Sequence, residues 1–114
     1  MKYALLIYDL PGTYDRLSDD EREAVFGEYF AIGNDPNVVG GEELQPIEAA
    51  TTVRVKDGET RTTDGPFADT QEFLGGFYML EADDIEAALE LAARIPAARL
   101  GGSVEVRPVV ERRP

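Results

Sequence analysis

The sequence predicts a single α+β domain, and three observations support this. Residues 2–9 and 74–81 are apolar on both faces, a pattern typical of strands that are covered on both sides. Two other segments combine a capping signal with the apolar spacing of a helix. The length of 114 residues suffices for one modest core. We therefore expect one domain over residues 1–114.

The first helix is expected from Asp19 to Ile32. Ser18 and Glu21 have the spacing of a capping box, and the acidic residues of the first turn interact favourably with the helix dipole. The segment 33–36, Gly-Asn-Asp-Pro, ends the helix. Two buried stripes are compatible with the spacing. These are Val25, Tyr29 and Ile32, or Phe26 and Phe30.

The second helix is expected to follow Asp83, with Glu86 three residues later, and to stop at Pro96. Its apolar stripe is narrow and rich in alanine, which suits close packing on a sheet. The stripe is expected to contain Ile85, Ala88, Leu89 and Ala92.

The middle of the chain predicts a β-hairpin. Residues 49–56 and 59–63 flank Asp57-Gly58, which suits a two-residue type I′ turn. In this register Lys56 faces Glu59, and Arg54 faces Arg61. The two arginines either lie on a solvated edge or recognise an anion. We assign no regular structure to the preceding Gly- and Glu-rich residues 38–46, which lack the Lys-Ser/Thr of a phosphate loop.

The last strand is expected over residues 103–110, with Val104, Val106 and Pro108 pointing inward.

The order strand, helix, hairpin, strand, helix, strand indicates a ferredoxin-like split β-α-β unit with an added hairpin strand. Two helices cover one face of such a sheet and leave large apolar residues of the other face in water. We therefore expect a symmetric homodimer whose sheets pack face to face.

Composition excludes several classes of function. The chain contains neither cysteine nor histidine, so disulfides, thiol nucleophiles, imidazole bases and ordinary zinc sites are excluded. A net charge of −12 argues against direct binding of nucleic acid. Because no apolar run reaches about 18 residues, and the start does not resemble a signal peptide, we expect a cytoplasmic protein without a membrane segment. We also expect no cofactor.

The candidate site lies at the turn Asp64-Gly65-Pro66-Phe67. Gly65 and Pro66 force the backbone to bend, and Asp64 either caps this turn or presents a carboxylate with a raised pKa as a general acid or base. The acids Asp64, Asp69 and Glu72 match no calcium-loop template, so no metal is expected. The expected binding residues are Tyr8, Glu42, Gln45, Arg54, Gly65, Pro66, Phe67 and Arg107.

Residues 63–70, Thr-Asp-Gly-Pro-Phe-Ala-Asp-Thr, followed by Leu-Gly-Gly-Phe-Tyr at 74–78, resemble the signature of the DGPF branch of the YCII-related family. The resemblance implies a dimeric α/β-barrel of ferredoxin-like subunits. One relative is a dehydrochlorinase that acts on a chlorinated hydroxyquinol, and a His-Asp pair has been proposed as a catalytic centre in the family. This chain lacks histidine, so only Asp64 has a candidate counterpart.

Two functions follow from these observations. In the first, a cleft near the DGPF loop binds a small phenolic or acidic compound, with Asp64 available for lyase-type acid/base catalysis. Tyr8 and either Arg54 or Arg107 would then stabilise an anionic oxygen. In the alternative, the chain is a regulatory or docking module with an acidic surface. Its partner would be an extracytoplasmic-function sigma factor, because the DGPF branch is associated with genes for such factors. A concave cavity would favour the first function and a flat acidic face the second.

Overall fold

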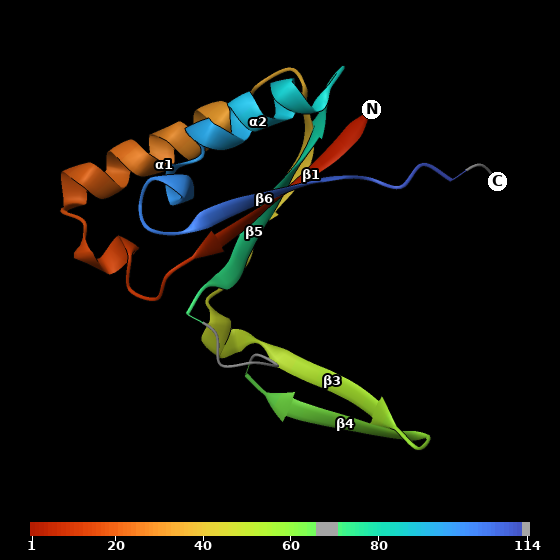
Figure 1. The fold of residues 1–114 in the computed structure, drawn as a ribbon. Coiled ribbons are helices and arrows are strands. Elements are labelled where there is room, and N and C mark those ends of the chain that lie inside the picture. The colour runs from red at the N-terminus through yellow and green to blue at the C-terminus, as the bar shows by residue number, and fades with distance from the viewer. Residues whose placement is uncertain (66–70, 113–114) are drawn as a thin grey trace.

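The computed structural model describes residues 1–65 and 71–112. Its main body is a four-stranded antiparallel sheet with the order β2-β5-β1-β6, and two helices cover one face of it (Figure 1). This order confirms the ferredoxin-like α+β class. The strands are β1 (Lys2–Asp9), β2 (Val38–Glu43), β5 (Phe73–Glu81) and β6 (Ser103–Pro108), and the helices are α1 (Asp19–Gly33) and α2 (Ile85–Arg94). Single-turn 3-10 helices occupy Tyr14–Arg16, Ile47–Ala49 and Pro96–Ala98.

Strand β2 is a correction to the sequence analysis, which assigned no regular structure to its residues. Glycine and glutamate have low strand propensity, so pairing with β5 decides the conformation of this segment. Gly41, at φ 152°, makes the pairing possible, because a Cβ there would lie 2.5 Å from the Phe77 carbonyl oxygen. Edge strand β2 thus supplies the fourth strand of the ferredoxin-like sheet.

The predicted hairpin is confirmed and forms a second, two-stranded sheet of β3 (Thr51–Lys56) and β4 (Glu59–Asp64). Both turn residues have positive φ, 52° at Asp57 and 79° at Gly58, as a type I′ turn requires. Arg54 faces Arg61 and Lys56 faces Glu59 in the expected register.

Helix α1 begins as predicted. Ser18 Oγ accepts a hydrogen bond from the Glu21 N–H at 3.1 Å, and Glu21 Oε1 accepts one from the Ser18 N–H at 2.9 Å. Val25 and Ile32 are buried, whereas Phe26 and Phe30 are 51 % and 75 % exposed. The stripe that contains Val25 therefore faces the sheet.

Helix α2 differs from the prediction in its cap and its buried stripe. The N-cap is Asp84 rather than Asp83, because Asp84 Oδ1 accepts a hydrogen bond from the Ala87 N–H at 3.0 Å. Ile85 and Leu89, which were expected to be buried, are exposed. The buried stripe continues into Ile95, which follows the helix. The residues of α2 alone therefore do not determine which of its faces is buried. The buried residues of the helix are Ala88, Leu91 and Ala92.

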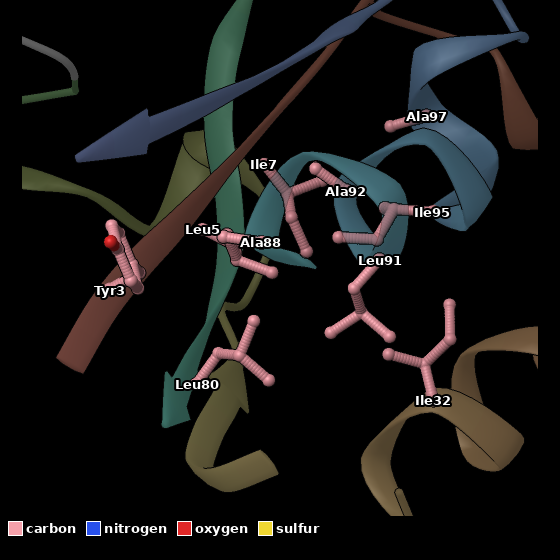
Figure 2. Close-up of a cluster of buried hydrophobic side chains, with 10 residues drawn as sticks. All are labelled: Tyr3, Leu5, Ile7, Ile32, Leu80, Ala88, Leu91, Ala92, Ile95 and Ala97. Carbon is pink, nitrogen blue, oxygen red and sulfur yellow. The ribbon is translucent and has the colours of Figure 1, made fainter. Parts of the chain in front are cut away.

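The core lies between the helices and the sheet (Figure 2). Alternate residues of β1 point toward the helices, and alanines of α2 let the helix approach the sheet closely. Val104 and Val106 of β6 pack against this core, as their alternation predicted. Pro108, which was also expected to point inward, is exposed, because β6 ends at this residue rather than at residue 110. The buried cluster contains Tyr3, Leu5, Ile7, Ile32, Leu80, Ala88, Leu91, Ala92, Ile95 and Ala97.

The other face of the sheet, called the open face here, is not covered by either helix (Figure 1). By strand alternation and register it carries Ala4, Leu6 and Tyr8 of β1 and Phe77 and Met79 of β5, all half-buried.

Among the described residues, no helix is long and apolar enough to span a membrane.

Candidate functional site

A cavity of about 660 Å³ lies on the helix side of the sheet. It is bordered by α1, by the segment after β1, and by the paired strands β2 and β5. Its volume is within the range of sites for small organic molecules, roughly 300–1,000 Å³. Aromatic side chains form much of the wall, namely Tyr14, Phe26, Tyr29, Phe30 and Tyr78.

Asp9 places a buried carboxyl group at this cavity. It is the last residue of β1, and strand alternation puts it on the same face as Leu5 and Ile7. The residue is only 8 % exposed. Gly75 of β5 leaves the necessary space, because a Cβ at that position would overlap Asp9 Oδ2.

Tyrosine hydroxyls connect Asp9 to helix α1. Tyr14 donates a hydrogen bond to Asp9 Oδ1 at 2.9 Å, and the hydroxyls of Tyr14 and Tyr29 are 3.0 Å apart. Because an ionised carboxylate only accepts hydrogen bonds, the Tyr14 proton points to Asp9, and Tyr29 donates to Tyr14. Tyr78 in turn donates to the Tyr29 carbonyl oxygen at 2.9 Å. The Tyr29 and Tyr14 hydroxyls therefore form a chain that ends on the carboxyl group, whereas Tyr78 is bound to the backbone of Tyr29.

Burial changes the acidity of the groups in this network. It raises the pKa of Asp9, and the nearby charge of Glu43 adds to this rise, whereas the hydrogen bond from Tyr14 opposes it. Burial also raises the pKa of the Tyr14, Tyr29 and Tyr78 hydroxyls, which stay protonated at neutral pH. Asp9 is thus a stronger base than an exposed aspartate, and the tyrosines are hydrogen-bond donors.

Arg22 holds the Tyr14 segment against α1. Its guanidinium donates to the Tyr14 carbonyl oxygen at 3.2 and 3.0 Å and to the Leu17 carbonyl oxygen at 3.2 Å. It also pairs with Asp19 at 3.2 Å. Arg22 is therefore a positioning residue for Tyr14, and its positive charge is partly neutralised by Asp19.

The charged residues around the cavity are mostly acidic. Asp9, Asp15 and Glu43 line it, and Arg22 is the basic residue among the described lining residues. Glu42 also borders the cavity, but its pairing with Phe77 directs its side chain to the open face. An anion that entered the cavity would meet repulsion from the carboxylates that line it. The cavity thus favours an uncharged or cationic ligand.

Of the DGPF-loop residues, Asp64 and Gly65 lie at the end of hairpin strand β4 and are not among the residues that line the cavity. Asp64 is exposed at the end of β4 and pairs with Thr51, and Arg54 lies opposite Arg61. Gly65 accepts a hydrogen bond from Thr52 Oγ1 at 2.8 Å and donates its N–H to the Ala50 carbonyl oxygen at 2.6 Å. Pro66 and Phe67 lie outside the described residues.

The other predicted binding residues are spread across the main sheet. Glu42 of β2 borders the cavity, and Gln45 is exposed just after β2. Tyr8 and Arg107 belong to the open face, but Tyr8 pairs with Ser103 and Arg107 with Ala4. That register separates them by four residues along the strands, or about 13 Å. The structure therefore does not bring the described members of the predicted set together at one point.

The sequence analysis did not identify Asp9 and Tyr14 as site residues. A signal was present for Asp9, because it continues the alternation of Tyr3, Leu5 and Ile7 and so falls on their buried face. Burial of a carboxyl group is costly unless the group is hydrogen-bonded, so an aspartate at a buried position indicates a hydrogen-bond partner or a function. No comparable signal marks Tyr14, whose position depends on the Arg22 hydrogen bonds.

Within residues 1–65 and 71–112, no group of three or more acidic side chains could hold a metal ion. The fold and the cavity define a ferredoxin-like α+β domain with a cavity of small-molecule size beside a buried carboxyl group. Comparison with known proteins identifies the family of the chain. The YCII-related domain matches residues 1–113, and the chain belongs to that family.

Two relatives illustrate this placement. An uncharacterized protein of Rhizobium meliloti (strain 1021) is 36 % identical over 120 residues, which cover 100 % of this chain and 96 % of that protein. A structural relative is 5-chloro-2-hydroxyhydroquinone dehydrochlorinase from Burkholderia phenoliruptrix AC1100, in complex with 2,5-dihydroxybenzoquinone. The TM-score is 0.54 at 15 % identity, with 98 % of this chain and 96 % of the relative covered. At this identity the likeness concerns the fold.

Proposed function

We propose that the chain binds a small, uncharged hydroxylated aromatic compound in the cavity beside Asp9. The observation that carries this proposal is a buried carboxyl group, hydrogen-bonded to Tyr14, in an aromatic-lined cavity of about 660 Å³. Aromatic walls bind a ring, and a few convergent polar groups orient it.

The network assigns a role to each polar group. Asp9 accepts a hydrogen bond from a ligand hydroxyl, and Tyr14 keeps the carboxylate in place. Because the pKa of Asp9 is raised, the same carboxylate is suited to take the hydroxyl proton as a general base. Asp9 is therefore our candidate for the acid/base role, and Asp64 on the hairpin is the alternative carboxylate.

The family comparison adds one supporting point. The dehydrochlorinase of similar fold is complexed with a dihydroxybenzoquinone, which is a ring with hydroxyl substituents. Because these hydroxyls are vinylogous acids, the complex supports the shape of the proposed ligand and not its lack of charge. Of the two ligand classes expected from the sequence, phenolic and acidic, the acidic cavity here favours the phenolic one.

The test is a calorimetric titration with hydroquinone, catechol and benzoate at neutral pH. The uncharged phenols are expected to bind the wild type more tightly than the benzoate anion does. In Asp9→Asn, phenol affinity should fall about tenfold or more, because a hydrogen bond to a charged group contributes about 1.5–3 kcal/mol. Circular dichroism confirms that the variant is folded.

Asp64→Asn is the matched control, since it makes the same substitution at the exposed carboxylate of β4. It is expected to bind phenols as the wild type does. Unchanged phenol affinity in Asp9→Asn would refute the assignment of the site. Loss of affinity in Asp64→Asn alone would place the site at the hairpin.

We also propose that the chain forms a symmetric homodimer through the open face. Leu6, Phe77 and Met79 bring large apolar side chains to that face, and neither helix covers it (Figure 1). Packing two such faces together removes this surface from water. Sedimentation velocity over a range of protein concentrations tests the dimer, and a monomer at every concentration would refute it.

A further inference from the structure

We infer that the β3–β4 hairpin is an arm that packs against a second copy of the chain. This inference rests on the proposed homodimer and adds to it a specific contact surface: the hairpin face that carries Val53, Val55, Thr60 and Thr62, called the valine face here. The occupant of this face would be the partner subunit.

Within residues 1–65 and 71–112, the hairpin has little contact with the main sheet and the helices of its own subunit. Among the described residues, β3 and β4 pack chiefly against each other, and every residue of β4 is exposed. A two-stranded hairpin alone is marginally stable in water and needs a further strand or surface to pack on. A hairpin that stands away from the body is therefore expected to have a partner.

The two faces of the hairpin differ in chemistry. On one face Val53 pairs with Thr62 and Val55 with Thr60. The two valines are 59 % and 68 % exposed, although β-branched residues stabilise a sheet mainly when they pack. The other face carries the charged pairs Arg54–Arg61 and Lys56–Glu59. The valine face is thus the one suited to an interface, and the charged face is suited to solvent.

The position of the hairpin points to a second copy as the occupant. The hairpin projects from one end of the main sheet, on the side away from α1 and α2, which is the side of the open face (Figure 1). The radius of gyration of 16.1 Å exceeds the value of about 13 Å for a compact chain of this length. A copy that packs on the open face lies beside the arm, and two-fold symmetry gives both arms the same contact.

Charge and area favour the same occupant. The hairpin carries three basic and three acidic residues in a chain of net charge −12, so it is repelled less by a second copy than the body is. Four strands about 4.8 Å apart and roughly 25 Å long offer about 450 Å² of sheet face. A standard interface needs about 800 Å² per partner. The arm of one subunit and the area under its partner's arm, about 200 Å² each, are sufficient to account for the difference of about 350 Å².

Two neighbouring threonines provide a matched pair of variants. Thr62 lies on the valine face opposite Val53, whereas Thr63 lies on the other face opposite Thr52. Thr62→Asp and Thr63→Asp add the same charge to the same strand. We expect Thr62→Asp to raise the dimer dissociation constant about tenfold or more, and Thr63→Asp to leave it within about twofold of wild type. Sedimentation equilibrium measures the constants.

A second measurement tests the same contact without introducing a charge that could dissociate the dimer. The chain has no cysteine, so Val55→Cys introduces a single thiol. Its reaction with a thiol reagent is expected to be at least about tenfold slower at concentrations where the protein is dimeric than after dilution to monomer.

The outcomes separate the arm from the dimer. A dimeric wild type with an unchanged dissociation constant in Thr62→Asp, and with equal thiol reactivity before and after dilution, would refute the arm but leave the open-face dimer. A wild type that is monomeric at all concentrations would refute both. Equal weakening by Thr62→Asp and Thr63→Asp would show that the valine face is not the contact.

Discussion

Replacing Tyr14 by Phe removes the hydroxyl that donates to Asp9 Oδ1 at 2.9 Å and approaches the Tyr29 hydroxyl at 3.0 Å. A hydrogen bond to a charged group contributes about 1.5–3 kcal/mol, and one between neutral groups about 1 kcal/mol. At neutral pH, where Asp9 is ionised, we expect Tyr14→Phe to lower the free energy of unfolding by about 2 kcal/mol.

The loss is expected to depend on pH, and its sign follows from the pKa of Asp9. Because that pKa is raised in the folded state, Asp9 contributes most to stability below the ordinary carboxyl pKa of about 3.9, and this contribution is lost as pH rises through the folded-state pKa. The Tyr14 hydrogen bond favours the ionised form and limits that loss. Its removal therefore costs more at neutral pH than at about pH 4, where we expect about 1 kcal/mol.

Urea unfolding followed by far-UV circular dichroism measures both values, with the protein concentration held constant. Tyr78→Phe is the control, because the Tyr78 hydroxyl donates to the neutral Tyr29 carbonyl oxygen at 2.9 Å. Its cost of about 1 kcal/mol should be the same at both pH values. A cost of Tyr14→Phe that stays constant, or grows toward acid pH, would refute the proposed link between Tyr14 and ionised Asp9.

Two further predictions concern stability at neutral pH, measured by urea unfolding. Gly75→Ala places a Cβ against Asp9 Oδ2 and is expected to cost about 1–3 kcal/mol, whereas Gly27→Ala meets open space on α1 and is expected to stabilise by up to about 1 kcal/mol. Equal effects of the two substitutions would contradict the close approach of β5 to Asp9. Ser18→Ala removes the capping box of α1 and is expected to cost about 1 kcal/mol. No loss of stability in Ser18→Ala would show that this cap is dispensable.

Features that depend on residues close in sequence were predicted well. The Ser18–Glu21 capping box, the Asp57-Gly58 turn with its register, and the inward positions of Val104 and Val106 in β6 all match the structure. Each follows from side chains within a few positions of one another, where backbone geometry leaves few options.

Features that depend on pairing between distant residues were predicted poorly. Residues 38–43 have a composition that does not favour a strand, and β5 imposes the extended conformation on them. The stripe of α2 similarly depends on where Ile95 packs. In both cases a weak local preference was overridden by burial against a distant element.

The amino-acid pattern was sufficient to define the class of the domain and the chemistry available to it, since acid/base chemistry in a chain without cysteine or histidine falls to Asp, Glu, Tyr, Lys or Arg. It directed attention to Asp64, whose turn has distinctive local chemistry. The raised pKa of Asp9 depends on burial, and that burial comes from the approach of β5 at Gly75 and of the Tyr14 segment. Desolvation is a property of the packed neighbourhood in space, so only the tertiary structure identifies Asp9 as the buried carboxyl group.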